Sequence, residues 1–130
     1  MAQLQLVIVT PETTTFDSKV DGVTLPLIDG EAGVLPGHAA MIGRLGPGEV
    51  RTQGATAERF YVDGGFVQIE GGVVSILTGK SMPVGELDLA QAKADLEAAE
   101  NQESGNADLA AIKQKAVAQA RARIRLAERA

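Results

Sequence analysis

Residues 29–39 read DGEAGVLPGHA and lie in the middle of a region that otherwise favours strands. They hold three glycines, one of the five prolines and His38, the only histidine of the chain. Glycine adopts backbone conformations closed to other residues, and proline fixes φ and removes a hydrogen-bond donor. An ordinary strand pair needs fewer such residues. Two interpretations stay open: a tight double turn at a sheet corner, or a shaped surface loop that presents Glu31 and His38 to a partner.

Outward from this stretch, the chain divides by composition. Fourteen of the fifteen glycines and all five prolines precede residue 86, whereas residues 86–130 contain one glycine and fourteen alanines. Glycine and proline interrupt helices, and alanine favours them. We therefore predict a β domain over residues 1–85 and an α-helical domain over residues 86–130.

The β domain contains short runs rich in β-branched residues. After residues 3–9, these runs are residues 13–16, 19–27, 48–52, 59–62, 66–69 and 73–78. Asp63-Gly64-Gly65 and Glu70-Gly71-Gly72 separate the last three runs, and each is predicted to be a hairpin turn. Many short strands without intervening helices indicate an antiparallel sandwich or barrel.

The α domain has the pattern of a helical hairpin. Asp88, with Gln91 three residues on, is typical of a helix start. A second helix is predicted from about Ala107 to Arg129, after a polar turn over residues 101–106. Two apolar stripes are expected to pack together: Leu89, Ala92, Leu96 and Ala99 on the first helix, and Leu109, Ile112, Ala116, Ala120 and Ile124 on the second. Such small residues bury little area, so the hairpin is expected to be marginally stable alone.

Charge is divided unevenly along the chain. Residues 1–105 carry six Lys or Arg and fifteen Asp or Glu, a net charge of −9, while residues 106–130 carry six and two, a net charge of +4. The second helix is therefore cationic. Either its side chains are simply solvated, or the helix binds an acidic protein surface or a polyphosphate.

Composition and motifs argue against catalysis. The chain has no cysteine and one histidine, so a zinc site or a histidine-based triad is improbable. No phosphate loop, dinucleotide fingerprint or nucleophile elbow occurs. Acidic pairs such as Asp29 and Glu31 could act as acid and base, but acidic loop residues are usually solvated. We predict a non-catalytic chain without a metal.

Composition also bears on nucleic acids and membranes. A net charge of −5 and an aromatic content of 3% argue against a nucleic-acid partner. No apolar stretch is long enough to span a bilayer. Any association with a membrane is therefore expected to come through a protein partner.

Taken in order, several pieces of the chain resemble one family, the epsilon subunit of bacterial and chloroplast F-type ATP synthases. They are the strand motif at residues 4–11, the Phe16-Asp17 pair, the G-x-x-G-[VI]-x-P-x-H-A pattern at residues 30–39, a Gly64-Gly65-Phe66 turn, and an Ala-, Glu- and Arg-rich helical hairpin. The resemblance covers essentially the whole chain. It implies an N-terminal β-sandwich of about ten strands followed by two helices.

The resemblance also implies a place in the rotor. The sandwich would bind the gamma subunit on one side and polar loops of the c-ring at one end, on the cytoplasmic face of a bacterial inner membrane. The implied rotor interface consists of Glu31, Gly33, Pro36, His38 and Ala39. Glu31 would pair with a basic c-subunit loop, and His38 would contact gamma or the ring. The alternative is a stand-alone β-sandwich module that binds a small ligand, for which few aromatic residues are available.

The family's hairpin is a movable regulator that folds down or extends into the alpha/beta catalytic head and blocks ATP hydrolysis. Here the cationic side chains that suit an acidic segment of the beta subunit are Lys113, Lys115, Arg121, Arg123 and Arg125. The weak packing argued above would let the hairpin be switched between two arrangements.

Some relatives bind ATP on the folded hairpin through an [IL]-D-x-x-R-A motif and arginines of the second helix. In this chain Asp88, Arg121 and Arg125 match, but Gln91 stands where the motif has arginine. The missing arginine removes a charge-assisted contact worth about 1.5–3 kcal/mol. We therefore expect no resident cofactor, and regulatory ATP binding of millimolar affinity or none.

Overall fold

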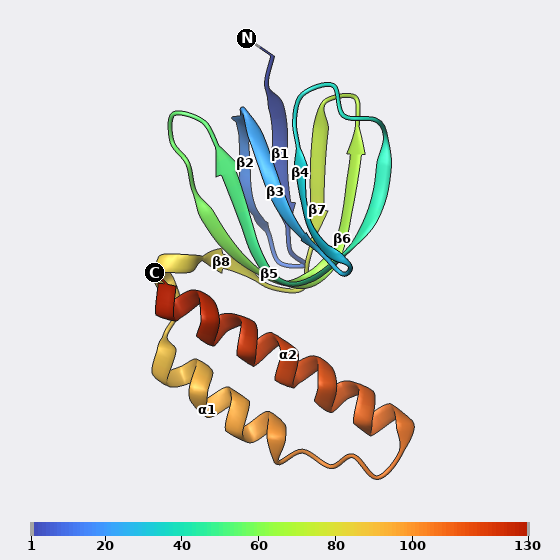
Figure 1. Cartoon of the computed structure of the whole chain (residues 1–130), viewed down its shortest axis with the longest axis vertical. Helices are drawn as coiled ribbons and strands as arrows, with labels where there is room; N and C mark the ends of the chain where they lie inside the picture. Colours follow the sequence, from blue (N-terminus) through green and yellow to red (C-terminus); the bar gives the residue numbers. More distant parts are fainter. Residues whose placement is uncertain (1, 130) are drawn as a thin grey trace. The chain divides into compact units, whose positions relative to one another are not determined.

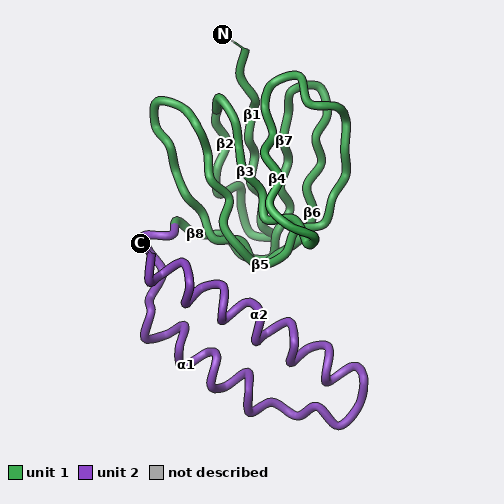
Figure 2. The backbone as a smooth tube through the Cα atoms, viewed as in Figure 1, with its two compact units in different colours: residues 1–83 green, residues 84–130 purple. Residues whose placement is uncertain are grey.

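The computed structural model describes residues 2–129 and contains two compact units, residues 1–83 and residues 84–130 (Figure 2). The first unit consists of strands and the second of helices. The strands are β1 (Leu4–Val9), β2 (Thr14–Val20), β3 (Gly22–Leu27), β4 (Gly30–Val34), β5 (Met41–Gln53), β6 (Arg59–Glu70), β7 (Val73–Leu77) and β8 (Ser81–Pro83).

The strands form a β-sandwich, as the sequence predicts (Figure 1). Their order in the sheet is β2-β1-β7-β6-β5-β3-β4, and β8 pairs with β6. The expectation that all strands run antiparallel is wrong at one pair, because β1 and β7 are parallel. Parallel neighbours need a long connection, which here is the whole chain between the two strands.

The core of the sandwich comes from alternate residues of its strands. In β1 the side chains of Leu4, Leu6 and Ile8 are buried, and the residues between them are half-buried. In β7 the side chains of Val74 and Ile76 are buried in the same way. This period of two places one face of each strand in the core and the other on the outside.

One of the two predicted glycine turns is wrong. β6 is continuous from Arg59 to Glu70, so the chain does not reverse at residues 63–65. Gly64 and Gly65 have φ of +106° and +118°, and a Cβ on Gly65 would lie 2.0 Å from the carbonyl oxygen of Leu77. Gly65 therefore lets β6 pass close to β7, while a Cβ on Gly64 would lie 3.2 Å from the carbonyl oxygen of Leu45 in β5.

The second glycine turn is confirmed. Gly71 and Gly72, with φ of +57° and +78°, join the paired residues Glu70 and Val73. The long strands β5 and β6, of 13 and 12 residues, also explain why the described residues form eight strands where about ten were expected. β6, for example, is one strand that covers two of the short runs, residues 59–62 and 66–69, which were counted as separate strands.

Residues 29–39 form a strand between two turns and not one loop. β4 pairs antiparallel with β3 across a two-residue tip, Ile28-Asp29. After β4 the chain turns again at Gly37, which has φ of +89°. Glycine meets the backbone requirement of this second turn, as expected. Glu31, however, lies in the edge strand β4 and not in a loop.

The helical unit contains a short 3-10 helix, η1 (Val84–Glu86), and the helices α1 (Leu89–Glu100) and α2 (Ala107–Arg129). The predicted cap of the first helix is confirmed, because the backbone N–H of Gln91 donates to Asp88 Oδ1 at 3.1 Å. Asn106 caps α2 in the same way, at 2.9 Å from the N–H of Leu109. The predicted extent of the second helix is also confirmed.

The stripe predicted on the second helix is only partly correct. Ala120 is buried, but Ile112 is 59% exposed. α2 has 23 residues and α1 has 12. Because Asp95 lies opposite Arg123, Ile112 falls past the end of α1 in this antiparallel pair.

Gly65→Ala tests the close approach of β6 to β7. The added methyl group meets the backbone of Leu77 in a conformation that non-glycine residues rarely adopt, so the substitution should lower the free energy of unfolding by about 3 kcal/mol or more. Gly33→Ala is the control, because a Cβ at Gly33 meets nothing within 4 Å. Urea unfolding followed by far-UV circular dichroism measures both variants. Equal stabilities would contradict the role of Gly65.

Candidate interaction surfaces

The residues predicted for the rotor interface follow one another along the chain from β4 to the segment before β5. Glu31 and Gly33 lie in β4, and the other three lie in the segment after it. Four of them are exposed, and Pro36 is half-buried. The structure therefore places them on the surface of the sandwich unit, and their contact with a partner stays a prediction.

His38 has a defined orientation within this segment. Its backbone N–H donates to the carbonyl oxygen of Leu35 at 3.1 Å. Its ring Nδ1 lies 2.7 Å from the carbonyl oxygen of Ala39. Because a carbonyl oxygen only accepts, Nδ1 carries the proton of this hydrogen bond. The neutral ring therefore has Nε2 as its acceptor atom.

Glu31 belongs to a network of charged side chains that was not predicted from the sequence. Arg51 donates from Nη1 and Nη2 to the two carboxylate oxygens of Glu31 at 2.9 and 3.3 Å. Arg51 Nη1 also donates to Glu49 Oε1 at 3.1 Å. Arg59 donates to the other oxygen of Glu49 at 2.6 Å. The network therefore joins β4, β5 and β6.

This network holds Glu31 in place. Hydrogen bonds from Arg51 to Glu31, and then to Glu49, raise the pKa of the arginine, so it stays charged throughout the physiological range. The network depends on the register of β5 and β6, which pairs Arg51 with Arg59 and places Glu49 two residues from Arg51. Strand register cannot be read from one sequence, so the network could not be predicted.

An exposed apolar surface lies on the outside of β1, β7, β6 and β5, and we call it the outer apolar face. Strand register lines up its members: Val9 pairs with Leu77, and Leu77 pairs with Phe66. Phe66 and Leu77 are 54% and 53% exposed. The full set is Val7, Val9, Ile42, Phe66, Val73 and Leu77.

The outer apolar face was not predicted from the sequence. The sequence feature that corresponds to this face is the presence of apolar residues on both sides of the same strand, as in residues 4–9, where the pattern becomes wholly apolar. Such a run predicts a strand buried on both sides. In the structure the second side of these strands carries an exposed apolar row from Val9 through Leu77 to Phe66, and Ser75 and Gln68 lie between Val7 and Ile42 on the same side.

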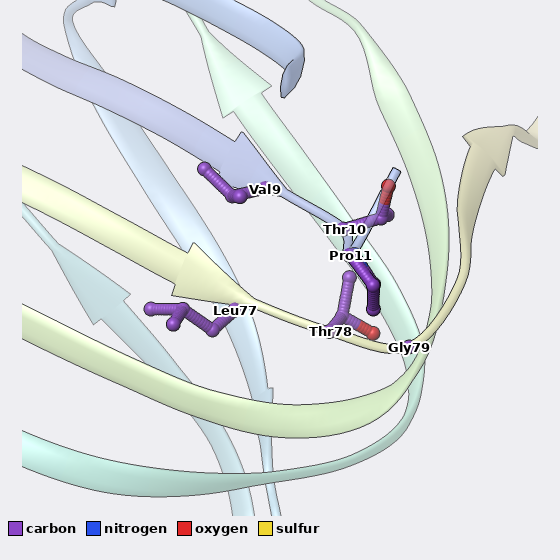
Figure 3. Close-up of a pocket in the computed structure, with 6 residues that line it drawn as sticks. All are labelled: Val9, Thr10, Pro11, Leu77, Thr78 and Gly79. Carbon is purple, nitrogen blue, oxygen red and sulfur yellow. The ribbon is translucent and has the colours of Figure 1, made fainter. Parts of the chain in front are cut away.

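A hollow of about 330 Å³ lies where β1 and β7 end, at the margin of the outer apolar face. Figure 3 shows the side chains of Val9 and Leu77 on neighbouring strands, with Thr10, Pro11 and Thr78 gathered beyond the strand ends. The hydroxyl of Thr10 donates to the carbonyl oxygen of Thr13, and that of Thr78 to the carbonyl oxygen of Lys80. Because both hydroxyls are used this way, the hollow suits an apolar group.

The cationic residues of α2 differ in their surroundings. Lys115, Arg121 and Arg125 are exposed, and Lys113 is half-buried. Arg123 is also half-buried, with a side chain 16% exposed, and it pairs with Asp95 of α1. The structure therefore separates Arg123 from the other cationic side chains that were predicted to form one face with it.

Of the three residues proposed for ATP binding, two line the same hollow. A hollow of about 500 Å³ in the helical unit is lined by Arg121 and Arg125, together with Leu96, Ile124, Glu128 and Arg129. Asp88 does not line it, and its carboxylate caps α1. The side chain of Gln91 donates to Asp95 at 2.9 Å.

Within residues 2–129, no group of three or more His, Asp or Glu side chains is placed to hold a metal ion. In the same part of the chain, no helix has both the length and the apolar character that crossing a membrane requires.

Several known proteins similar to this chain are ATP synthase epsilon chains. Residues 3–83 match the family described as "ATP synthase, Delta/Epsilon chain, beta-sandwich domain". The ATP synthase epsilon chain of Rhodopirellula baltica is 46% identical over 123 residues, which cover 94% of this chain and 96% of that one. The ATP synthase epsilon chain of Granulibacter bethesdensis is 42% identical over 104 residues, covering 76% and 77%.

The fold is also found in a solved structure. A chain in Euglena gracilis mitochondrial ATP synthase superposes with a TM-score of 0.80 at 24% identity, covering 94% of this chain and 79% of that one. The β-sandwich, the order of the motifs and the extent of the match to the relatives agree with one another. The chain therefore belongs to the ATP synthase delta/epsilon family, as an epsilon chain.

Proposed function

We propose that this chain is a non-catalytic rotor subunit of the central stalk of a proton-translocating F-type ATP synthase. Its sandwich couples the gamma subunit to the c-ring, and its helical hairpin restrains ATP hydrolysis by the alpha/beta head. It reaches the cytoplasmic face of the bacterial inner membrane only through this complex. The observation that carries the proposal is the outer apolar face, on a chain of the epsilon family.

The outer apolar face is the surface that we assign to gamma. Its exposed members bracket Phe66, and aromatic residues are enriched among those that dominate binding energy at protein interfaces. Arg44, the exposed partner of Phe66 in β5, supplies a polar edge to this row. The hollow beside Val9 and Leu77 has room for one apolar side chain of gamma. An apolar centre with a polar rim is typical of stable interfaces.

The segment from Glu31 to Ala39 is the surface that we assign to the polar loops of the c-ring. Arg51 fixes the carboxylate of Glu31, so a basic loop would meet an acid that has already lost its side-chain freedom. The ring of His38 is held by Ala39 and offers Nε2 to a donor. Both residues are therefore arranged for contact before the partner arrives.

The hairpin is the part that we assign to regulation. Lys115, Arg121 and Arg125 are exposed on α2 and fit an acidic segment of the beta subunit. The helices meet through alanines such as Ala92, Ala99 and Ala120, which bury little apolar area. Weak packing permits two arrangements that differ by a few kcal/mol.

Nucleotide has a minor part in this proposal. Arg121 and Arg125 line one hollow and could contact a phosphate, but Glu128 lines it too and repels one. The motif arginine is replaced by Gln91, whose side chain already bonds Asp95. Regulatory ATP binding is therefore millimolar or weaker.

Phe66→Glu tests the gamma surface. The residue is exposed, so the fold should persist, while a charge in the apolar face should raise the Kd for isolated gamma by about 30-fold or more, which corresponds to about 2 kcal/mol. The matched control is Ile112→Glu, at an equally exposed isoleucine of α2. Surface plasmon resonance with immobilised gamma measures both. An unchanged Kd for Phe66→Glu would overturn the assignment.

Titration calorimetry with Mg-ATP tests the nucleotide proposal. The isolated protein should give no saturable heat below about 1 mM, because the charge-assisted contact of the missing arginine is lost. The Arg121→Gln and Arg125→Gln variants should give the same trace as the unaltered protein. Saturable submillimolar binding that either variant abolishes would contradict this expectation.

A further inference from the structure

The two sides of the helical hairpin carry opposite charge. Residues 84–105 contain one basic residue, Lys93, and six acidic ones, whereas residues 106–129 contain six basic residues and two acidic ones. α1 packs against part of the longer α2. The hairpin is therefore held by electrostatic attraction as well as by its alanine contacts.

One ion pair joins the two helices directly. Arg123 Nη1 of α2 donates to Asp95 Oδ2 of α1 at 3.2 Å. The side chain of Arg123 is 16% exposed and that of Asp95 is 39% exposed, so this pair is less screened by solvent than a surface pair. Gln91 donates to the other oxygen, Asp95 Oδ1, at 2.9 Å, one turn earlier on α1. Both carboxylate oxygens of Asp95 are thus engaged, which fixes the orientation of the acid toward α2.

We infer that Asp95 is an internal substitute for an acidic partner surface: it holds Arg123 within the closed hairpin and limits how readily α2 becomes available to a partner. This inference rests on the proposed regulatory role of α2. When α2 leaves α1, Arg123 loses the carboxylate of Asp95, and water or another carboxylate can take the place of that contact. A protein surface rich in Asp and Glu can supply it, so the partner competes directly with Asp95.

The ion pair between Asp95 and Arg123 is weak enough for a partner's carboxylates to replace Asp95. A partly exposed ion pair contributes little compared with a packed core, so a partner with several carboxylates can replace it. Apart from Leu126, the buried side chains of α1 and α2 are alanines among the described residues, so the apolar core of the hairpin is small and the pair adds to its closure. A hairpin locked by a deeply packed core would not respond to an acidic surface.

Two spin labels measure closure of the hairpin in the full chain. The chain has no cysteine, so Ala90→Cys on α1 and Ala118→Cys on α2, both exposed, give one label on each helix. In this background Asp95→Asn should raise the ratio of open to closed hairpins about fivefold in the pulsed electron–electron distance distribution. The control Glu97→Gln removes the same charge from an exposed residue that points about 200° away from Asp95 on α1, and should leave the ratio unchanged.

A charge reversal separates loss of the pair from loss of the fold. Combining Asp95→Arg with Arg123→Asp should restore the closed population that each single change lowers, while circular dichroism reports helix content. An open-to-closed ratio that Asp95→Asn leaves unchanged would overturn the inference, as would an equal effect of Glu97→Gln. Failure of the double variant to recover closure while helix content is kept would overturn it too.

ATP hydrolysis by the assembled complex then tests the regulatory role separately. If Asp95→Asn opens the hairpin and hydrolysis falls, both the inference and the proposed function are supported. If the hairpin opens and hydrolysis is unchanged, Asp95 still closes the hairpin, and the proposed inhibition by α2 is contradicted.

Discussion

The parallel pairing of β1 with β7 is the constraint on which the rest of the strand unit depends. β1 joins β2 to the sheet, and β7 leads to β6 and the remaining strands, so this pair connects the two halves of the sheet. Backbone hydrogen bonds extend it at both ends, from the N–H of Gln5 to the carbonyl oxygen of Gly72 and from the N–H of Thr78 to that of Val9. The core residues of β1 and the outer apolar face both require this register.

The two units differ in what holds them together. The sandwich has a continuous core of buried Leu, Ile and Val side chains, whereas the helical hairpin has a small core of alanines and Leu126, together with the pair between Asp95 and Arg123. Burying larger side chains stabilises more strongly, so the strand unit is the fixed part and the hairpin is the part that can rearrange at modest cost. This division matches a coupling surface on the sandwich and a regulatory role for the helices.

Local patterns predicted most of the secondary structure. The helix start at Asp88, the extent of the second helix and the turn at Gly71-Gly72 depend on neighbouring residues alone, and the structure confirms them. The mistakes arose where distant residues decide. Gly65 resembles a turn residue, but the nearby backbone of Leu77 makes it part of a continuous strand. The outer apolar face and the network around Arg51 depend on strand register, which a single sequence does not contain.

The most direct measurement of the central claim is ATP hydrolysis by the assembled complex, with either the full chain or a chain that ends at Pro83. If the sandwich couples and the helices restrain, the shortened chain should still assemble and support coupled proton transport, and hydrolysis should rise. Assembly that fails without residues 84–130, or hydrolysis that stays at the level of the full chain, would contradict this division of roles.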